Sequence, residues 1–189
     1  VVNAYGLDIS EAGRISDIAF KTVEKGKTTF PQLASSVGRV APIAAQMNVS
    51  IEELFASLAT LTKTGLSTDE AVTRVSGTLN AFMKPTEEAK KKAKEMGFEM
   101  SAAAFKSKGF TGALKEIETL VGDDTDALGE LIPNVRGLGA VMALTGKNAD
   151  DYRENLDAVT NSVGAMDTAH KKIANGISDR YDQSVNKIS

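Results

Sequence analysis

"NVSIEELFASLATLTKTGLS", residues 48–67, carries the start and the end of one α-helix. Ser50 and Glu53 have the S-x-x-E spacing, in which each side chain accepts a hydrogen bond from the backbone N–H of the other residue. Apolar side chains then recur at helical spacing along one face, namely Ile51, Leu54, Phe55, Leu58 and Leu61. Gly65 supplies the stop, because glycine adopts the left-handed conformation that ends many helices. The stretch therefore predicts an amphipathic α-helix with defined ends.

The same start signal recurs directly after this helix. Ser67 and Glu70 again have the S-x-x-E spacing, and an apolar stripe continues toward Pro85. Two capped helices that are separated by a short glycine turn favour an antiparallel hairpin. We expect this hairpin to belong to a helical core that spans residues 1–96.

Helical signals extend over nearly the whole chain, so the predicted fold class is all-α. Upstream of the hairpin, Thr29 predicts the start of another helix, and Pro42 is expected to kink or split it because proline removes a backbone donor. The predicted architecture is a compact multi-helix domain of antiparallel helical hairpins that ends in a long amphipathic helix.

The domain organisation follows from where the helical signals weaken. Residues 97–110 are the least helical part and predict an extended connector. Residues 111–189 predict a second helical part, whose long C-terminal helix starts at Asn148. The apolar spacing thins after Asp167, so this tail is expected to pack on something outside the sequence or to fray. The chain begins with Val1, and we expect it to be an excerpt of a longer protein.

The composition excludes several function classes. The chain has 189 residues, 42% of them hydrophobic, and a net charge of −3, which gives no general attraction to nucleic acid or anionic lipid. Cysteine is absent, so disulfides, thiolate nucleophiles and cysteine metal sites are impossible. The most apolar stretch, residues 137–146, is too short to span a bilayer, which needs about 20 residues.

No motif assembles a chemical site. The only histidine, His170, lies in the weakly patterned tail without a nucleophile near it in sequence. Residues 145–148, "TGKN", lack the earlier glycine and the Ser or Thr of a phosphate loop. Residues 123–130, "DDTDALGE", lack the glycine and terminal glutamate of a calcium loop, and indicate acids at a helix start. We therefore predict no catalytic, cofactor-binding or metal-binding residues and no enzymatic activity; partner-binding residues stay unknown.

Two charged features each allow a structural interpretation and a binding interpretation. A lysine run on a short helix could bind phosphate, but a solvated helix face is favoured: Lys90, Lys91, Lys92 and Lys94. The paired helices after Ser50 could be a helix-turn-helix, but Arg74, Asn80 and Lys84 stand among acids and threonines, which disfavours DNA recognition.

Glycine is unusually frequent inside helical patterns. Each such glycine destabilises a helix by about 1 kcal/mol relative to alanine. The positions are Gly13, Gly38, Gly77, Gly129, Gly137, Gly139 and Gly164. Close helix packing is the simpler explanation, as in Ala34-x-x-x-Gly38 or Gly77-x-x-x-Ala81. The alternative is a fold that is built to be undone easily.

The order of these segments resembles the core region of tail tape-measure proteins of long-tailed bacteriophages and prophages. The resemblance rests on "F-x-x-LA-x-S-x-G-x-VAP-x-A" from Phe30, "VS-x-EEL-x-A-x-LA-x-LTK-x-G" from Val49, "EA-x-T" from Glu70 and "F-M-K-P" from Phe82. "PNVRGLGAVMALTG", followed by a long helix, also fits. Nothing characteristic is found in residues 182–189.

The resemblance implies a structural protein of the phage tail, located in the virion and in the host cytoplasm during assembly. It implies contacts with tail-tube, tail-tip and assembly-chaperone proteins, and several copies of the chain in the tail. A continuous helix of this length would span about 280 Å. The many caps and breaks favour a compact anchoring or initiation domain over the repetitive ruler. A helical protein-binding adaptor without catalytic activity is the alternative, and a hydrolase is a third class.

Overall fold

The computed structural model describes residues 1–122 and 124–172, which form helices joined by turns and short loops, with no strand among them. The labelled α-helices are α1 Ala12–Lys25, α2 Phe30–Ser36, α3 Ala41–Gln46, α4 Ile51–Lys63, α5 Thr68–Met83, α6 Glu87–Glu95, α7 Ala102–Val121, α8 Thr125–Leu131, α9 Val135–Leu144 and α10 Ala149–Thr160. Four short 3-10 helices and a helical segment over residues 165–172 complete these parts of the chain. The all-α prediction is confirmed.

Helix α4 begins and ends where its sequence predicts. The Ser50 hydroxyl accepts from the Glu53 amide at 3.1 Å, and the Glu53 carboxylate accepts from the Ser50 amide at 3.0 Å. Ser67 and Glu70 form the same reciprocal pair at the start of α5. Gly65 has φ of 103°, a conformation that glycine adopts without strain. The two helices contact each other across this turn.

Helix α4 is central to the fold, because it contacts α1, α5, α9 and α10. Its polar side chains are buried together with its apolar ones, and their hydroxyls bond to carbonyls one turn earlier. Thr60 donates to Ala56 at 2.9 Å and Thr62 donates to Leu58 at 2.8 Å. Because these buried hydroxyls each have a hydrogen-bond acceptor, neighbouring helices can enclose α4 without leaving these polar groups unpaired.

Pro42 splits the helix that was predicted to contain it. Helix α2 is followed by the 3-10 helix Val37–Arg39, and α3 starts afresh with Pro42 in its first turn. Proline is tolerated there because the first turn has no intrahelical acceptor for its missing N–H. The predicted break is confirmed.

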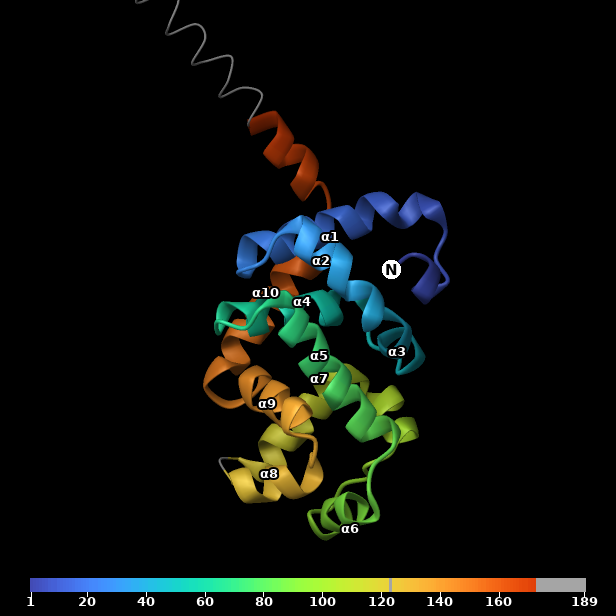
Figure 1. Cartoon of the computed structure of the whole chain (residues 1–189), viewed down its shortest axis with the longest axis vertical. Helices are drawn as coiled ribbons and strands as arrows, with labels where there is room; N and C mark the ends of the chain where they lie inside the picture. The colour runs from blue at the N-terminus through green and yellow to red at the C-terminus, as the bar shows by residue number, and fades with distance from the viewer. Residues whose placement is uncertain (123, 173–189) are drawn as a thin grey trace, which may run out of the picture.

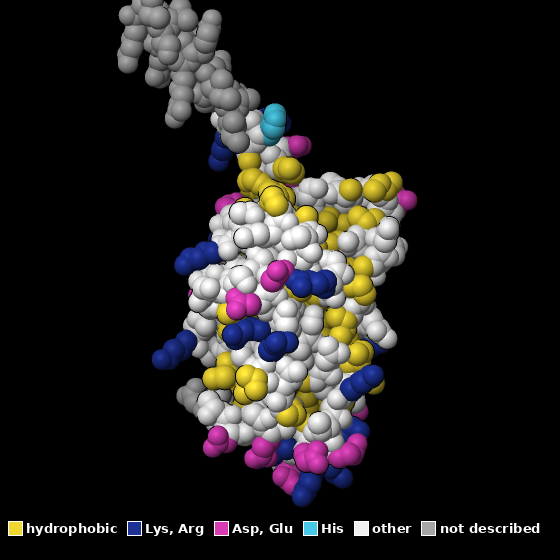
Figure 2. Space-filling view, viewed as in Figure 1, with side chains coloured by type: hydrophobic (Ala, Val, Ile, Leu, Met, Phe, Trp, Pro, Cys, Tyr) yellow, Lys and Arg dark blue, Asp and Glu magenta, His cyan; other side chains and the backbone are white. Residues whose placement is uncertain are grey.

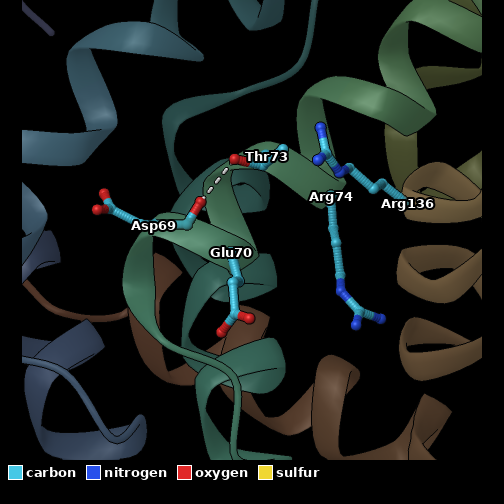
Figure 3. Close-up of a pocket in the computed structure, with 5 residues that line it drawn as sticks. All are labelled: Asp69, Glu70, Thr73, Arg74 and Arg136. Atoms are coloured by element: carbon cyan, nitrogen blue, oxygen red, sulfur yellow. Dashed lines mark hydrogen bonds between the residues drawn. The ribbon is translucent and has the colours of Figure 1, made fainter.

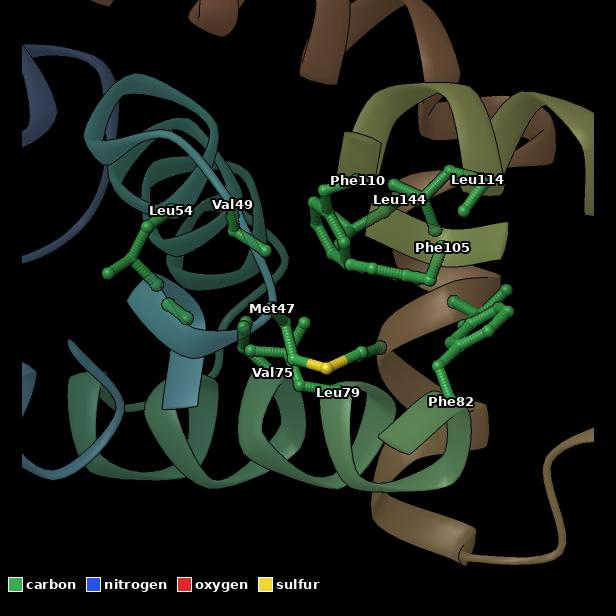
Figure 4. Close-up of a cluster of buried hydrophobic side chains, with 14 of the residues drawn as sticks. Met47, Val49, Leu54, Val75, Leu79, Phe82, Phe105, Phe110, Leu114 and Leu144 are labelled. Carbon is green, nitrogen blue, oxygen red and sulfur yellow. The ribbon is translucent and has the colours of Figure 1, made fainter. Parts of the chain in front are cut away.

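The aromatic side chains join the two halves of the chain in one core (Figure 4). The ring centroids of Phe82 and Phe105 are 4.8 Å apart, and those of Phe105 and Phe110 are 6.1 Å apart. Tyr152 of α10 meets the edge of Phe110 at 6.4 Å. Apolar side chains from α5, α7, α9 and the loop before α4 close around them, including Met47, Val49, Val75, Leu79, Leu114 and Leu144.

The prediction of an extended connector over residues 97–110 is wrong from Ala102 onward. Ser101 caps α7, its hydroxyl accepting from the Ala104 amide at 3.1 Å, and the helix continues to Val121. It is interrupted only at Gly109, whose φ of 73° and ψ of 174° are non-helical. Burial of the phenylalanine side chains on either side of Gly109 stabilises the helix despite this break. The division into two helical domains at this segment stays a prediction.

The predicted long C-terminal helix is also divided. Helix α10 ends at Thr160, and Gly164, with φ of 74°, lies in a turn before the helical segment 165–172. The Asp17 carboxylate of α1 accepts from the amides of Gly164 and Met166, each at 2.9 Å, and so caps this segment. The predictions for the tail beyond it, including Ile173, Ile177, Ile188 and residues 182–189, lie outside the described residues.

The body is longer than it is wide (Figure 1). Helices α1, α2 and α10 lie toward one end, α5, α7 and α9 in the middle, and α6 and α8 at the other end. The segment 165–172 leaves the body at the end where α1 lies. The two most extensive helix pairings are α5 with α9 and α4 with α10, so helices from the first and second halves of the chain alternate through the body.

Candidate docking site at the crossing of α5 and α9

The sequence motifs that could have formed a catalytic or metal site do not come together in space. His170 is exposed on the segment 165–172. Asp124 caps α8, and residues 145–148 line a shallow cleft of about 290 Å³ beside it. Among residues 1–122 and 124–172, no group of three or more histidine, aspartate or glutamate side chains could hold a metal ion. Within the same residues, no helix is both long and apolar enough to cross a bilayer.

The lysine run of α6 is engaged with neighbouring acids. Lys90 pairs with Glu87 at 2.6 Å, and Lys92 pairs with Glu130 of α8 at 3.0 Å. The Glu130 carboxylate raises the pKa of Lys92, chiefly through its hydrogen bond. These pairs agree with the interpretation of a solvated helix face.

The helix-turn-helix interpretation fails because α9 packs along α5. A recognition helix needs a free face to enter the major groove. The side chain of Arg74, which that interpretation assigned to DNA, instead packs over the backbone of Gly139 in α9.

Helices α5 and α9 cross at two glycines. A Cβ atom added at Gly77 would lie 2.8 Å from the Gly137 nitrogen, and one added at Gly137 would lie 2.8 Å from the Gly77 carbonyl carbon. The Thr78 hydroxyl donates to the Gly137 carbonyl at 3.1 Å across the contact. The close-packing interpretation is therefore confirmed at these glycines.

Other glycines in helical patterns do not serve this purpose. Nothing lies within 4 Å of a Cβ atom added at Gly13, Gly38 or Gly129. The prediction of close helix packing at Ala34-x-x-x-Gly38 is wrong at Gly38, which lies in a 3-10 helix next to open space.

A cleft of about 310 Å³ opens beside the crossing (Figure 3). Its lining combines two acids and two arginines with a threonine: Asp69, Glu70, Thr73, Arg74 and Arg136. Arg136 extends from α9 toward α5, and Arg74 extends from α5 into the space between the two helices. The first two turns of α5 and the first turn of α9 thus bring Arg136 close to charges that lie at least 62 residues earlier in the sequence.

Both carboxylates of the cleft already have partners. Asp69 accepts from the Ser36 hydroxyl and from the Arg39 guanidinium, and these bonds lower the pKa of Asp69. Glu70 accepts from the Ser67 hydroxyl at 2.7 Å and the Ser67 amide at 2.9 Å, which lowers the pKa of Glu70. Both groups are therefore anionic near neutral pH and are held by their own side of the cleft.

The two arginines are different. Neither Arg74 nor Arg136 makes a side-chain ion pair or hydrogen bond with any described residue. A guanidinium carries five N–H donors in a planar fork that matches a carboxylate or phosphate. The cleft therefore holds two guanidinium groups beside two carboxylates, and the charge of Arg74 contributes to the lowered pKa of Glu70.

Apolar side chains are also exposed on α9, although they do not line this cleft. Val135, the residue before Arg136, is 79% exposed, and Met142 on the same helix is 47% exposed. A second hollow of about 430 Å³ lies on the other side of the crossing, with Ala81, Pro85 and Pro133 in its wall. Figure 2 shows basic and acidic side chains side by side in the middle of the visible face, hydrophobic ones below them and further acidic ones at the lower end.

Sequence reasoning did not identify this site. The sequence motifs offer Arg74 only as a possible DNA contact, and they assign no binding role to Arg136. The available signal was the pair of glycines, Gly77 and Gly137, inside two helical patterns, each with an arginine close by in sequence. Nothing local in the sequence indicates that these two glycines meet.

The comparisons with known proteins find phage tail proteins. The chain is 29% identical over 187 residues to a "Probable tape measure protein" of Clostridium phage phiCD119, covering 95% of the chain and 20% of the relative. It is 24% identical over 191 residues to the "Tape measure protein" of Pneumococcus phage Dp-1, covering 99% of the chain and 16% of that relative. The chain thus spans a fifth or less of the length of these relatives. No solved structure is significantly similar.

The family assignment rests on the larger part of the chain. Residues 1–132 match the family described as "Phage-related minor tail protein". This match includes α1 to α8 and all the sequence segments up to Pro85 that carried the resemblance. The chain belongs to the family of phage-related minor tail proteins.

Proposed function

We propose that this chain is a folded domain of a tail tape measure that anchors the tape measure or initiates tail assembly. It is then not part of the extended ruler. The proposal includes a location in the virion tail, and in the host cytoplasm during assembly. It also includes contacts with tail-tube, tail-tip and chaperone proteins, several copies in each tail, and no catalytic role.

One observation carries the proposal, namely the packing between distant parts of the chain. The Thr78 hydroxyl meets the Gly137 carbonyl across 59 residues, and the Asn155 amide donates to Thr60 across 95 residues. A ruler needs length in proportion to its residues, which a continuous helix provides at 1.5 Å per residue. A chain that folds back on itself gives up most of that length, so it is better suited to hold a fixed position.

The runner-up, a helical protein-binding adaptor without catalytic activity, is supported by the apolar side chains that are exposed on α9. Binding by itself does not separate the two functions, because an anchoring domain also binds partners. Tail length separates them.

The decisive experiment deletes the codons for this segment in a phage that encodes it and measures tail length by electron microscopy. Abolished tails, or tails of uncontrolled length, would support an anchoring or initiation domain. Tails shortened by up to about 280 Å would mean that the segment acts as ruler length and would overturn the proposal. Normal tails would also overturn it and would favour the adaptor.

A further inference from the structure

We propose that α10 and the segment that follows it, residues 149–172, form a strap that detaches from α1 and α4 as one unit while the rest of the domain stays folded. We call these residues the α10 strap. The inference concerns an opening that is built into the fold, and it does not depend on the proposed function.

A buried amide lies in the middle of the face that α10 turns toward the body. The buried residues of α10 are Ala149, Tyr152, Asn155 and Val159. Asn155 is 0% exposed, and its Nδ2 atom donates to the Thr60 hydroxyl of α4 at 2.9 Å. Its Oδ1 atom is also buried, but no donor among the described residues reaches it.

This unpaired acceptor favours the detached state of α10. A buried carbonyl oxygen without a donor costs free energy, because it has lost its hydrogen bonds to water. Water reaches the Asn155 side chain once α10 leaves α4, so detachment of α10 removes the cost. Opening of a distant part of the body does not remove it.

Unpaired buried atoms are confined to the ends of the described chain. Among residues 1–122 and 124–172, the other buried side-chain polar atom without a partner is the Tyr5 hydroxyl, in the 3-10 helix Asn3–Tyr5. Within the same residues, α4, α5 and α9 contain no such atom. The polar groups of the central packing are thus satisfied, whereas those of the terminal elements are not.

The edges of α10 are held by ion pairs at the surface. Glu154 pairs with Lys25 of α1 at 2.8 Å, Arg153 pairs with Glu118 of α7 at 3.2 Å, and Asp151 pairs with Lys63 of α4. Each pair has an exposed partner, so each contributes little to stability and is weakened further by salt. In addition, no side chain caps the N-terminus of α10. These contacts orient α10 without fixing it firmly.

Gly146 provides a hinge between α9 and α10. It opens the 3-10 helix Gly146–Asn148 with φ of 57°, and nothing lies within 4 Å of an added Cβ atom. Glycine changes its backbone angles with little steric restriction. The α10 strap can therefore swing away while α9 keeps its packing on α5.

The test is native-state hydrogen exchange of the 189-residue chain, followed by NMR for each amide at rising urea concentrations below the unfolding transition. An opening smaller than global unfolding exposes less surface, so its free energy depends less steeply on urea. The hydrogen-bonded amides of α10 are expected to exchange through such an opening, at a lower free energy than those of α5 and α9. The same free energy and the same urea dependence for all three helices would overturn the proposal.

Asn155→Leu tests the cause of the opening. Leucine has nearly the shape of asparagine and removes the unpaired acceptor, while the Thr60 hydroxyl keeps its bond to the Ala56 carbonyl. Exchange of the α10 amides is expected to slow by at least about fivefold.

The matched control is Gly129→Ala in α8, which is expected to stabilise the domain outside the α10 strap. It is expected to slow exchange of the α5 and α9 amides and to leave that of the α10 amides unchanged. Slower α10 exchange in this control would mean that α10 opens only with the whole domain, which overturns the proposal.

Unchanged or faster α10 exchange in Asn155→Leu would also overturn it, because Oδ1 would then have a partner such as a buried water. Circular dichroism confirms that each variant is folded, and the measurement on the unmodified chain decides the main point without any variant. None of these outcomes changes the expected result of the deletion experiment on tail length.

Discussion

At Gly77, one methyl group is enough to push two helices apart. A Cβ atom at that position would meet the backbone of Gly137 at 2.8 Å, and backbone atoms cannot move aside as a side chain does. We expect Gly77→Ala to lower the free energy of unfolding by about 1–3 kcal/mol, in spite of alanine's better helix propensity. Chemical denaturation followed by circular dichroism measures the change.

Gly129 supplies the matched control for this substitution. It also lies in a helix, α8, but no atom is within 4 Å of an added Cβ. Gly129→Ala is expected to raise the free energy of unfolding by up to about 1 kcal/mol. Equal effects at Gly77 and Gly129 would contradict the close crossing, and a gain at both would support glycines selected for easy unfolding.

Glu70 makes the stability depend on pH in the acidic range. Its bonds to Ser67 lower its pKa in the folded chain below the ordinary 4.5, so the ionised form stabilises the fold. This contribution is complete above pH about 4.5 and is lost as the pH falls through the lowered pKa.

The expected result is a thermal midpoint that declines below pH about 4.5, with a smaller decline in Glu70→Gln. Scans between pH 7 and pH 3 test it. The decline in the variant does not vanish, because Asp8, Asp69 and Glu154 also have lowered pKa values. An identical pH profile for both proteins would show that the Ser67 bonds do not favour the charged form.

At the scale of the elements, helices whose signals are local were predicted, whereas the first part of α7, residues 102–110, whose stability is not local, was missed. The reciprocal pairs at Ser50 and Ser67 act within four residues, so the sequence alone defines the starts of α4 and α5. Helix α7 contains Gly109 in a conformation that no helix favours, and its two parts are held by burial of Phe105 and Phe110 against distant residues. Such tertiary stabilisation is absent from any short window of sequence.

Helix α7 also depends on a side chain from α4. After the break at Gly109, the Thr111 amide and hydroxyl donate to the Glu53 carboxylate at 2.9 and 2.8 Å, and Thr111 also bonds to Tyr152 at 3.0 Å. Glu53 thus completes the cap of its own helix and caps the second part of α7.

We expect Glu53→Ala to lower the free energy of unfolding by about 2–3 kcal/mol, because it removes both functions. Glu70→Ala is the internal comparison, since Glu70 occupies the same position in the cap of α5 but has no second helix to hold. Urea titration of both variants gives the difference. A loss at Glu53 no larger than that at Glu70 would mean that the contact with α7 contributes nothing.

At the scale of the whole molecule, the pairings that define the body were beyond the sequence. Periodicity indicates which face of α5 or α9 is buried, but not that the two helices cross at Gly77 and Gly137. The cleft and its arginines are products of that crossing, so the site could not be predicted before the fold. The all-α class, by contrast, follows from periodicity and caps that each segment carries by itself.

Solution scattering tests the folded body directly. A compact domain of this size has a radius of gyration of about 16 Å, whereas a continuous helix of about 280 Å would give a value several times larger. We expect a value close to the compact estimate for the 189-residue chain. A much larger radius would contradict the packing of α9 and α10 on α5 and α4.

The cap that Asp17 places on residues 164–166 has a mechanical consequence. The 3-10 helix Asn3–Tyr5 packs on α3, and the segment 165–172 departs beside α1, so both ends of the described chain lie toward the same end of the body (Figure 1). Tension applied between these ends would load α1 and α10 first and bypass the middle of the body. Traction would therefore peel the domain open from one end, and the crossing of α5 and α9 would be the last part to yield.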